Sequence, residues 1–203
     1  MNCHLASGPD LGSRRSEMFA TALSALSKQI GSEFDTDGAA DFNFILGDLN
    51  YRFKTTYQKH IKRVEESKNM LFDLDELTYE RMINNKYPKY LEMPINFDPT
   101  YKREFDQAFS YINKKEQCPS YCDRIMFKSN DQHSSIVGTY YNSIESILGS
   151  DHRPVTLSCT VTFPFENFVD SGRLQDVTRP HQGHGVCTIK NLILKLDTSK
   201  TEL

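Results

Sequence analysis

The sequence predicts an α+β protein in which short β-strands end at polar turns and amphipathic helices lie between them. Phe42 to Leu46 gives the clearest strand signal, because a run of about five β-forming residues suits a buried strand and is too short for a helix. Arg14 to Ile30 gives the clearest helix signal, because apolar residues recur at three- and four-residue spacing from Phe19 onward. The chain has 203 residues, 38% hydrophobic and 25% charged, the ordinary composition of a soluble globular domain.

The remaining elements are predicted in chain order from the same patterns. Strands are expected at Met1 to Leu5, Phe42 to Leu46, Ile125 to Phe127, Ile136 to Tyr141, Val155 to Phe163 and Val186 to Leu196. Two more short helices are expected at Thr55 to Met70 and Leu74 to Ile83. The stretch from Tyr87 to Tyr111 is dense in aromatic residues and prolines, so we expect irregular chain there, over the mouth of a cleft.

Hydropathy, cysteine content and charge exclude several classes of protein. No apolar run approaches the roughly 18 residues of a transmembrane helix, and Met1 to Gly12 lacks the basic start and apolar stretch of a signal peptide. Five scattered cysteines, an odd number, favour reduced thiols over a disulfide framework, so we expect a cytoplasmic protein. A net charge of −3 argues against nucleic acid as a partner, because nucleic-acid binding usually needs a basic surface.

Polar residues follow the strand predicted at Phe42 to Leu46. Gly47 is expected to end this strand, and Asp48 and Asn50 are expected to project from its carboxyl end, where a rigid sheet can hold polar groups at a cleft. The alternative is a purely structural Asx turn, because Gly, Asp and Asn are ordinary turn residues. The rest of the chain has to decide between these two interpretations.

Four further clusters of polar residues adjoin short apolar stretches elsewhere in the chain. Together with the cluster around Asp48 and Asn50 they make five motifs, which are Asn2 to Ala6, Gly47 to Arg52, Pro99 to Lys102, Pro119 to Arg124 and Ser150 to Val155. In this order they resemble the inositol polyphosphate 5-phosphatases, a branch of the endonuclease/exonuclease/phosphatase superfamily. One such motif is weak support, whereas five in the family's order leave little room for coincidence. The resemblance implies a two-sheet β-sandwich flanked by helices.

The resemblance also implies a division of the chain. Residues 1–163 would be a partial, N-terminally incomplete catalytic domain, 164–185 a linker, and 186–203 the start of a truncated β-domain. The family's domain carries upstream an asparagine and the glutamate that is its principal magnesium ligand. Neither can be placed in this sequence.

The resemblance implies hydrolysis of a phosphate monoester by direct attack of water, which excludes Cys3 and Cys122 as nucleophiles. Such a reaction needs an activated water, a divalent ion and donors for the charge of the transition state. The family pattern assigns Asp48 to the attacking water. It assigns Asn50 and His4 to hydrogen bonds with the phosphate.

The other catalytic assignments come from the two later motifs. His152 would donate to the scissile phosphate, Asp123 would hold the other ring nitrogen of His152, and Asp151 would lie beside the metal, Mg²⁺. Taken singly, each histidine can equally be a structural residue, and Asp123 with Arg124 can be an ion pair. Their co-occurrence favours catalysis.

Substrate binding is assigned to basic and aromatic residues near the irregular stretch. Tyr101, Lys102 and Lys115 match positions that hold the inositol 4-phosphate in lipid-acting members, and Arg124 is counted with them. Gln117 departs from the family, since many members have a second basic residue there. Without the family pattern, Lys115 would be interpreted as part of a solvated turn.

The expected function is therefore Mg²⁺-dependent removal of the 5-phosphate from a phosphoinositide lipid or a soluble inositol polyphosphate, by a cytoplasmic protein acting at membrane surfaces. Because the principal metal ligand is not found, we expect the 203 residues alone not to turn over substrate. Two alternatives stay open. One is an inactive phosphoinositide-binding or interaction module, and the other is a phosphodiesterase such as a nuclease, which would have no need of the Lys102 and Lys115 pocket.

Overall fold

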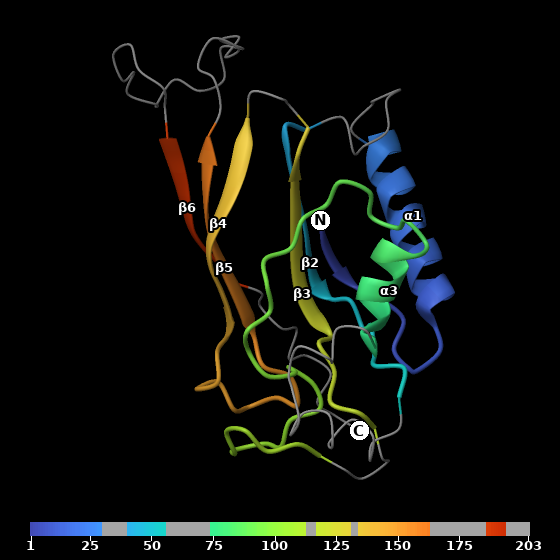
Figure 1. Ribbon diagram of the computed structural model, residues 1–203, viewed down its shortest axis with the longest axis vertical. Helices are drawn as coiled ribbons and strands as arrows, with labels where there is room; N and C mark the ends of the chain where they lie inside the picture. Colours follow the sequence, from blue (N-terminus) through green and yellow to red (C-terminus); the bar gives the residue numbers. More distant parts are fainter. Residues whose placement is uncertain (30–39, 56–73, 113–116, 131–133, 163–185, 194–203) are drawn as a thin grey trace.

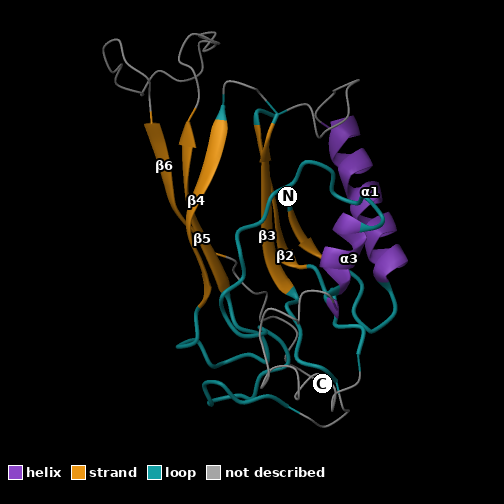
Figure 2. Ribbon diagram, viewed as in Figure 1, coloured by secondary structure: helices purple, strands orange, loops and turns teal. Residues whose placement is uncertain are grey.

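The computed structural model describes residues 1–29, 40–55, 74–112, 117–130, 134–162 and 186–193, the last of these as backbone only. Within these residues the chain forms two three-stranded sheets and two helices (Figure 1). Neither helix is long and apolar enough to cross a bilayer. The two sheets stack as separate layers, and both helices lie on the outer side of the first sheet (Figure 2). This arrangement confirms the predicted sandwich with flanking helices.

The first sheet has the strand order β1 (Asn2–His4), β2 (Phe42–Asp48) and β3 (Asp123–Ser129). β1 runs parallel to β2, and β3 runs antiparallel to β2. The register pairs His4 with Asp48 and Asp48 with Asp123. Three residues from distant parts of the sequence therefore form one row across the end of the sheet.

The second sheet is antiparallel and has the order β4 (Ser135–Ser143), β5 (Val155–Thr162) and β6 (Val186–Ile193). β6 pairs with β5 along most of its length, so it extends this sheet. A further domain beginning near residue 186 stays a prediction.

The hydrophobic core is divided between the two faces of the first sheet. Along β3, Ile125 and Phe127 face the layer between the sheets while Met126 faces the helices, because successive strand residues point to opposite sides. The cluster between the sheets comprises Phe53, Ile95, Phe97, Tyr121, Ile125, Phe127, Tyr141, Val155 and Leu157. The cluster under the helices comprises Leu5, Phe19, Ile45, Leu49, Tyr51, Leu77, Tyr87, Tyr90 and Met126.

The helices begin and end close to their predicted bounds. α1 (Gly12–Gln29) contributes Phe19 to the helix-side cluster, and α3 (Glu76–Met82) contributes Leu77. Asp75 caps α3, because its carboxylate accepts a hydrogen bond from the Thr78 backbone N–H at 2.9 Å. The helix predicted at Thr55 to Met70 lies almost wholly outside the described residues.

The prediction that Gly47 ends its strand is wrong, since β2 continues through Asp48. Gly47 has φ +133° and still pairs with Arg124, while the backbone carbonyl oxygen of Cys3 lies so close that it would clash with a Cβ at this position. Only glycine permits this conformation and this approach. By contrast, Tyr87 to Tyr111 is irregular as predicted and carries only isolated bridges.

Replacing Gly47→Ala is expected to lower the free energy of unfolding by about 3 kcal/mol or more, because the new Cβ meets β1 backbone and the φ is unfavourable. Gly149→Ala is the matched control, since its new Cβ would have no neighbouring atom within 4 Å and the change should stay within about 0.5 kcal/mol. Urea unfolding measures both. Equal stability of the two variants would contradict the close approach of β1 to Gly47.

Candidate functional site

The row of residues at the end of the first sheet forms the floor of the site. His4 Nε2 lies 3.4 Å from Asp48 Oδ2. The side chain of His4 is 71% exposed and that of Asp48 is 12% exposed, so the histidine stands at the rim and the carboxylate lies deeper. On the other side of Asp48 stands Asp123, which is fully buried. Two carboxylates therefore lie next to each other at the end of paired strands.

His152 lies in the turn before β5, and its side chain contacts the row. Its Nδ1 lies 2.9 Å from Asp123 Oδ2, and its Nε2 lies 3.9 Å from Asp48 Oδ2. Thr100 Oγ1 donates to the same Asp123 oxygen at 2.6 Å. Because a carboxylate accepts hydrogen bonds, Nδ1 of His152 carries a hydrogen and donates it to Asp123. The other ring nitrogen, Nε2, faces Asp48. The predicted pairing of Asp123 with His152 is present in the structure.

Burial and the charges of this row raise the pKa values of Asp48 and His152. Burial, followed by the charge of Asp123, raises the pKa of Asp48 to about 6, against the opposing effect of His152, His4 and the Asn50 backbone. Burial alone would lower the pKa of His152, but Asp123, Asp48 and Asp151 outweigh it and raise that pKa to about 8. Between about pH 6 and pH 8, Asp48 is therefore an anion and His152 a cation.

Asn50 lies beside this row but is only 2% exposed. It has a left-handed φ of 55°, and its backbone N–H donates to Asp48 Oδ1 at 3.0 Å, which closes an Asx turn. Its side-chain Nδ2 donates to the Leu5 carbonyl at 3.0 Å, and its Oδ1 accepts from Arg52 Nη2. The side-chain amide of Asn50 thus fixes the turn that carries Asp48. The stretch is an Asx turn, as the structural interpretation had it, and this turn also positions a carboxylate of the candidate site.

The predicted substrate residues Tyr101 and Lys102 lie beside His152. The ring of Tyr101 is 4.5 Å from that of His152, centroid to centroid, and the two residues form an antiparallel bridge. Lys102 Nζ lies 3.7 Å from Asp151 Oδ2, and both side chains are about a third exposed, at 32% and 31%. The structure therefore brings together an accessible cation and an accessible carboxylate at the edge of the row.

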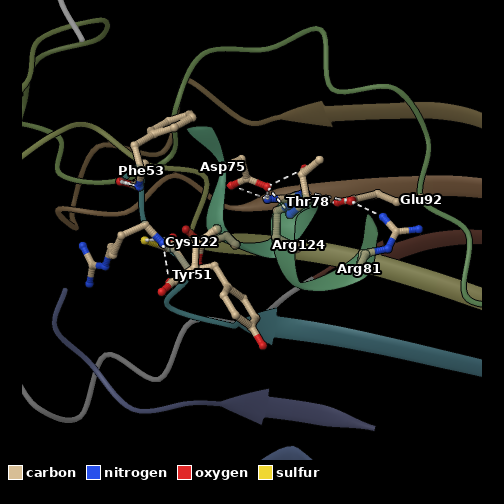
Figure 3. Close-up of polar contacts among 12 residues, drawn as sticks. Tyr51, Phe53, Asp75, Thr78, Arg81, Glu92, Cys122 and Arg124 are labelled. Atoms are coloured by element: carbon tan, nitrogen blue, oxygen red, sulfur yellow. Dashed lines mark hydrogen bonds and ion pairs between the residues drawn. The ribbon is translucent and has the colours of Figure 1, made fainter. Parts of the chain in front are cut away.

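Arg124 is not part of this group. It is 1% exposed, and its guanidinium donates to both Asp75 oxygens at 3.0 and 3.1 Å and to Glu92 at 2.7 and 2.8 Å. Figure 3 shows this network at the start of α3. The assignment of Arg124 to substrate binding is not supported by this placement, because two carboxylates already saturate its donors. Lys115 lies outside the described residues.

Cys122 precedes Asp123 in the chain, but its thiol is not a reactive group of the site. It is fully buried, its thiol donates to the Tyr51 carbonyl, and burial raises its pKa well above the ordinary value (Figure 3). A protonated, inaccessible thiol is a poor nucleophile. The burial of Cys122 therefore makes this residue unsuited to attack a substrate.

The carboxylates of the site suit a divalent cation. Asp48, Asp123 and His152 offer ligand atoms within 4.8 Å of one another, and Asp123 Oδ1 is buried with no hydrogen-bond partner among the described residues. Magnesium, however, prefers oxygen ligands and keeps several waters, so it needs accessible carboxylates rather than a buried one. Asp151, at 31% exposed, meets that condition, whereas Asp48 is 12% exposed and Asp123 is better matched to its histidine.

Two residues of the site had no role in the sequence assignment. Thr100 supports Asp123, and Arg52 binds Asn50 and lies over the Tyr101 ring. Both belong to the motifs that carry the family resemblance. Their position in those motifs was the only sequence signal for a role at the site. Sequence spacing could not predict the contact between residues 52 and 101, because they are far apart in the chain.

Comparison with known proteins agrees with this geometry. Residues 1–158 match the model of Endonuclease/Exonuclease/phosphatase family 2. The chain is 33% identical over 178 residues to phosphatidylinositol 3,4,5-trisphosphate 5-phosphatase 2A of Danio rerio, covering 81% of this chain and 14% of that protein. It is 30% identical over 154 residues to inositol-1,4,5-trisphosphate 5-phosphatase 1 of Schizosaccharomyces pombe, covering 75% and 13%. The chain thus spans about a seventh of the length of the first of these relatives.

Two solved structures share the fold. The inositol polyphosphate 5-phosphatase domain of SPsynaptojanin, solved with inositol (1,4)-bisphosphate and a calcium ion, matches with a TM-score of 0.65 and 29% identity, over 76% of this chain and 44% of that one. A ferrous NO complex of Cimex nitrophorin matches with a TM-score of 0.52 and 29% identity, over 59% and 41%. The chain therefore belongs to the endonuclease/exonuclease/phosphatase family, and among its members it resembles the inositol polyphosphate 5-phosphatases.

Proposed function

We propose that this site, in a domain of the extent seen in the solved relative, removes the 5-phosphate from a phosphoinositide or a soluble inositol polyphosphate with the help of magnesium. The observation that carries the proposal is the imidazole of His152, held by Asp123 at 2.9 Å and facing Asp48 at 3.9 Å. The names of the relatives, which are 5-phosphatases of trisphosphates, support the substrate class.

The charge states of the row suit hydrolysis near neutral pH. Asp48 has a pKa of about 6, so above that pH it accepts a hydrogen bond or a proton from an attacking water. His152 has a pKa of about 8, so below that pH its Nε2–H donates to a phosphate oxygen as charge develops. Asp123 keeps the ring in the required tautomer.

Asp151 would contribute to holding the magnesium ion, which when bound neutralises phosphoryl oxygens and so lowers the barrier to attack. Lys102 is a point charge for a second phosphate of the substrate, since only Asp151 pairs with it among the described residues. A lipid substrate would place the protein at the surface of a membrane in the cytoplasm.

A second candidate is a phosphoinositide-binding module without turnover. The two functions share Lys102 and His152 as phosphate contacts, and they differ in whether phosphate is released.

The first prediction concerns the pKa of His152 in the chelator-treated chain. Its ring protons should titrate near pH 8 by NMR, and Asp123→Asn should lower that pKa, because the carboxylate favours the imidazolium. Since the folded pKa is above the ordinary 6.5, the imidazolium stabilises the fold fully below pH 6.5, and this stability is lost as pH rises through about 8. Asp10→Asn, in the exposed loop before α1, is the control. A His152 pKa at or below 6.5 would contradict the proposed charge state.

The second prediction concerns the 203-residue chain alone. We expect it to bind inositol 1,4,5-trisphosphate in calorimetry without releasing phosphate in millimolar magnesium, because Asp151 is a single accessible carboxylate ligand for an ion that dehydrates reluctantly. Binding should weaken in Lys102→Ala and persist in Lys86→Ala, an exposed lysine elsewhere. Phosphate release at the rate of a complete relative would show that the chain holds a metal site other than this one.

The third prediction concerns a chimera in which residues 1–158 replace the matching segment of the solved synaptojanin domain. It should release phosphate from phosphatidylinositol 4,5-bisphosphate, and Asp48→Asn should slow release by about 100-fold or more. Lys102→Ala should raise KM about tenfold, because it removes one charged contact to phosphate. Plasmid nicking that survives Lys102→Ala, without phosphate release, would identify a nuclease instead.

A further inference from the structure

We propose that Arg52 and Tyr101 are positioning residues for His152, acting as a stack of guanidinium, phenol and imidazole that holds the imidazole against Asp123. The sequence assigned Tyr101 to gripping the substrate and gave Arg52 no role. The catalytic meaning of the stack rests on the function proposed above, whereas its geometry stands independently.

The stack begins at the turn that follows β2. Asn50 is fixed by three hydrogen bonds, one to the Leu5 carbonyl, one to Asp48 Oδ1 and one from Arg52. Arg52 Nε also donates to the Asn50 carbonyl at 3.3 Å. A guanidinium held at both its Nε and its Nη2 by one residue has little rotational freedom. Asn50 therefore sets where the cation of Arg52 lies.

Tyr101 is the middle layer, and its backbone is fixed on two sides. It exchanges hydrogen bonds with Ser120, at 3.1 and 2.6 Å, and it bridges His152. The flanking bonds, from Arg103 N–H to the Asp151 carbonyl and from Arg153 N–H to the Thr100 carbonyl, hold the two chain segments together. The ring of Tyr101 is therefore carried on a rigid backbone.

Both neighbouring layers contact that ring closely. The Arg52 guanidinium carbon is 4.2 Å from the ring centroid, and the His152 ring centroid is 4.5 Å from it, with 42° between the planes. A cation over an aromatic ring is attracted by the ring's quadrupole, and the imidazolium form of His152 shares that attraction. The Tyr101 ring therefore contacts both Arg52 and His152.

The stack restricts a motion that the Asp123 contact leaves open. A single hydrogen bond at Nδ1 fixes one nitrogen, but the imidazole can still swing about it. The Tyr101 ring against the imidazole removes that swing and keeps Nε2 directed toward Asp48. This role needs an aromatic ring at position 101, so Tyr101→Phe and Tyr101→Leu should differ.

The test uses the 203-residue chain. The ring protons of His152 should show a ring-current displacement in NMR that Tyr101→Phe retains and Tyr101→Leu abolishes. Tyr101→Leu should weaken binding of inositol 1,4,5-trisphosphate about tenfold in calorimetry, and Tyr101→Phe should weaken it less. The matched control is Tyr111→Leu, because Tyr111 also lies over an arginine, Arg103, at 4.6 Å, and it should leave the His152 signals in place.

Two results would overturn the stack. One is His152 signals that do not move in Tyr101→Leu. The other is Tyr101→Phe weakening binding as much as Tyr101→Leu does, which would make the hydroxyl a substrate contact. If Tyr101→Leu fails to fold, Arg52→Met takes its place, and unchanged His152 signals in that variant overturn the proposal. Displaced His152 signals in a chain that binds no inositol phosphate would support the stack and overturn the proposed function.

Discussion

The register of β2 between its two neighbours is the constraint on which the site depends. Gly47 lets the backbone of β1 approach closely enough for His4 to pair with Asp48, and the antiparallel register of β3 brings Asp123 to the same level. Slipping β2 by one residue against either neighbour would turn its side chains to the opposite face and separate these carboxylates. The chemistry of the site is therefore a consequence of strand pairing more than of any local motif.

Two clusters of charge lie close together on this sheet and behave differently. Arg124 is saturated by Asp75 and Glu92, so its network stabilises the packing of α3 on the sheet and leaves no group free for a ligand. In the row of Asp48, Asp123 and His152, burial raises the pKa of Asp48 and the neighbouring carboxylates raise the pKa of His152. Pairs of titratable groups whose surroundings shift their pKa values in this way are typical of acid and base catalysis.

The fold by itself does not decide the function. The same architecture matches a 5-phosphatase domain solved with an inositol bisphosphate and a nitrophorin solved as a ferrous NO complex. A shared scaffold with such different ligands means that function has to be argued from the side chains at the site. Here those side chains are a buried Asp–His pair, a second carboxylate and an accessible lysine, and the function proposed above is argued from them.

The sequence by itself determined the alternation of strands and helices, because apolar periodicity is a local property. Its motifs, through their resemblance to a known family, pointed to His4, Asp48, Asp123 and His152, which the structure brings together. The sequence placed the end of β2 two residues short, since the close approach that keeps Gly47 in the strand comes from β1. Only the tertiary structure showed that the side chain of Arg124 lies outside the site. Asp123 and Arg124 are neighbours on β3 and must point to opposite faces, so one reaches His152 and the other reaches Asp75. The support of Asp123 by Thr100 and of His152 by Tyr101 and Arg52 likewise depends on segments that meet only after folding.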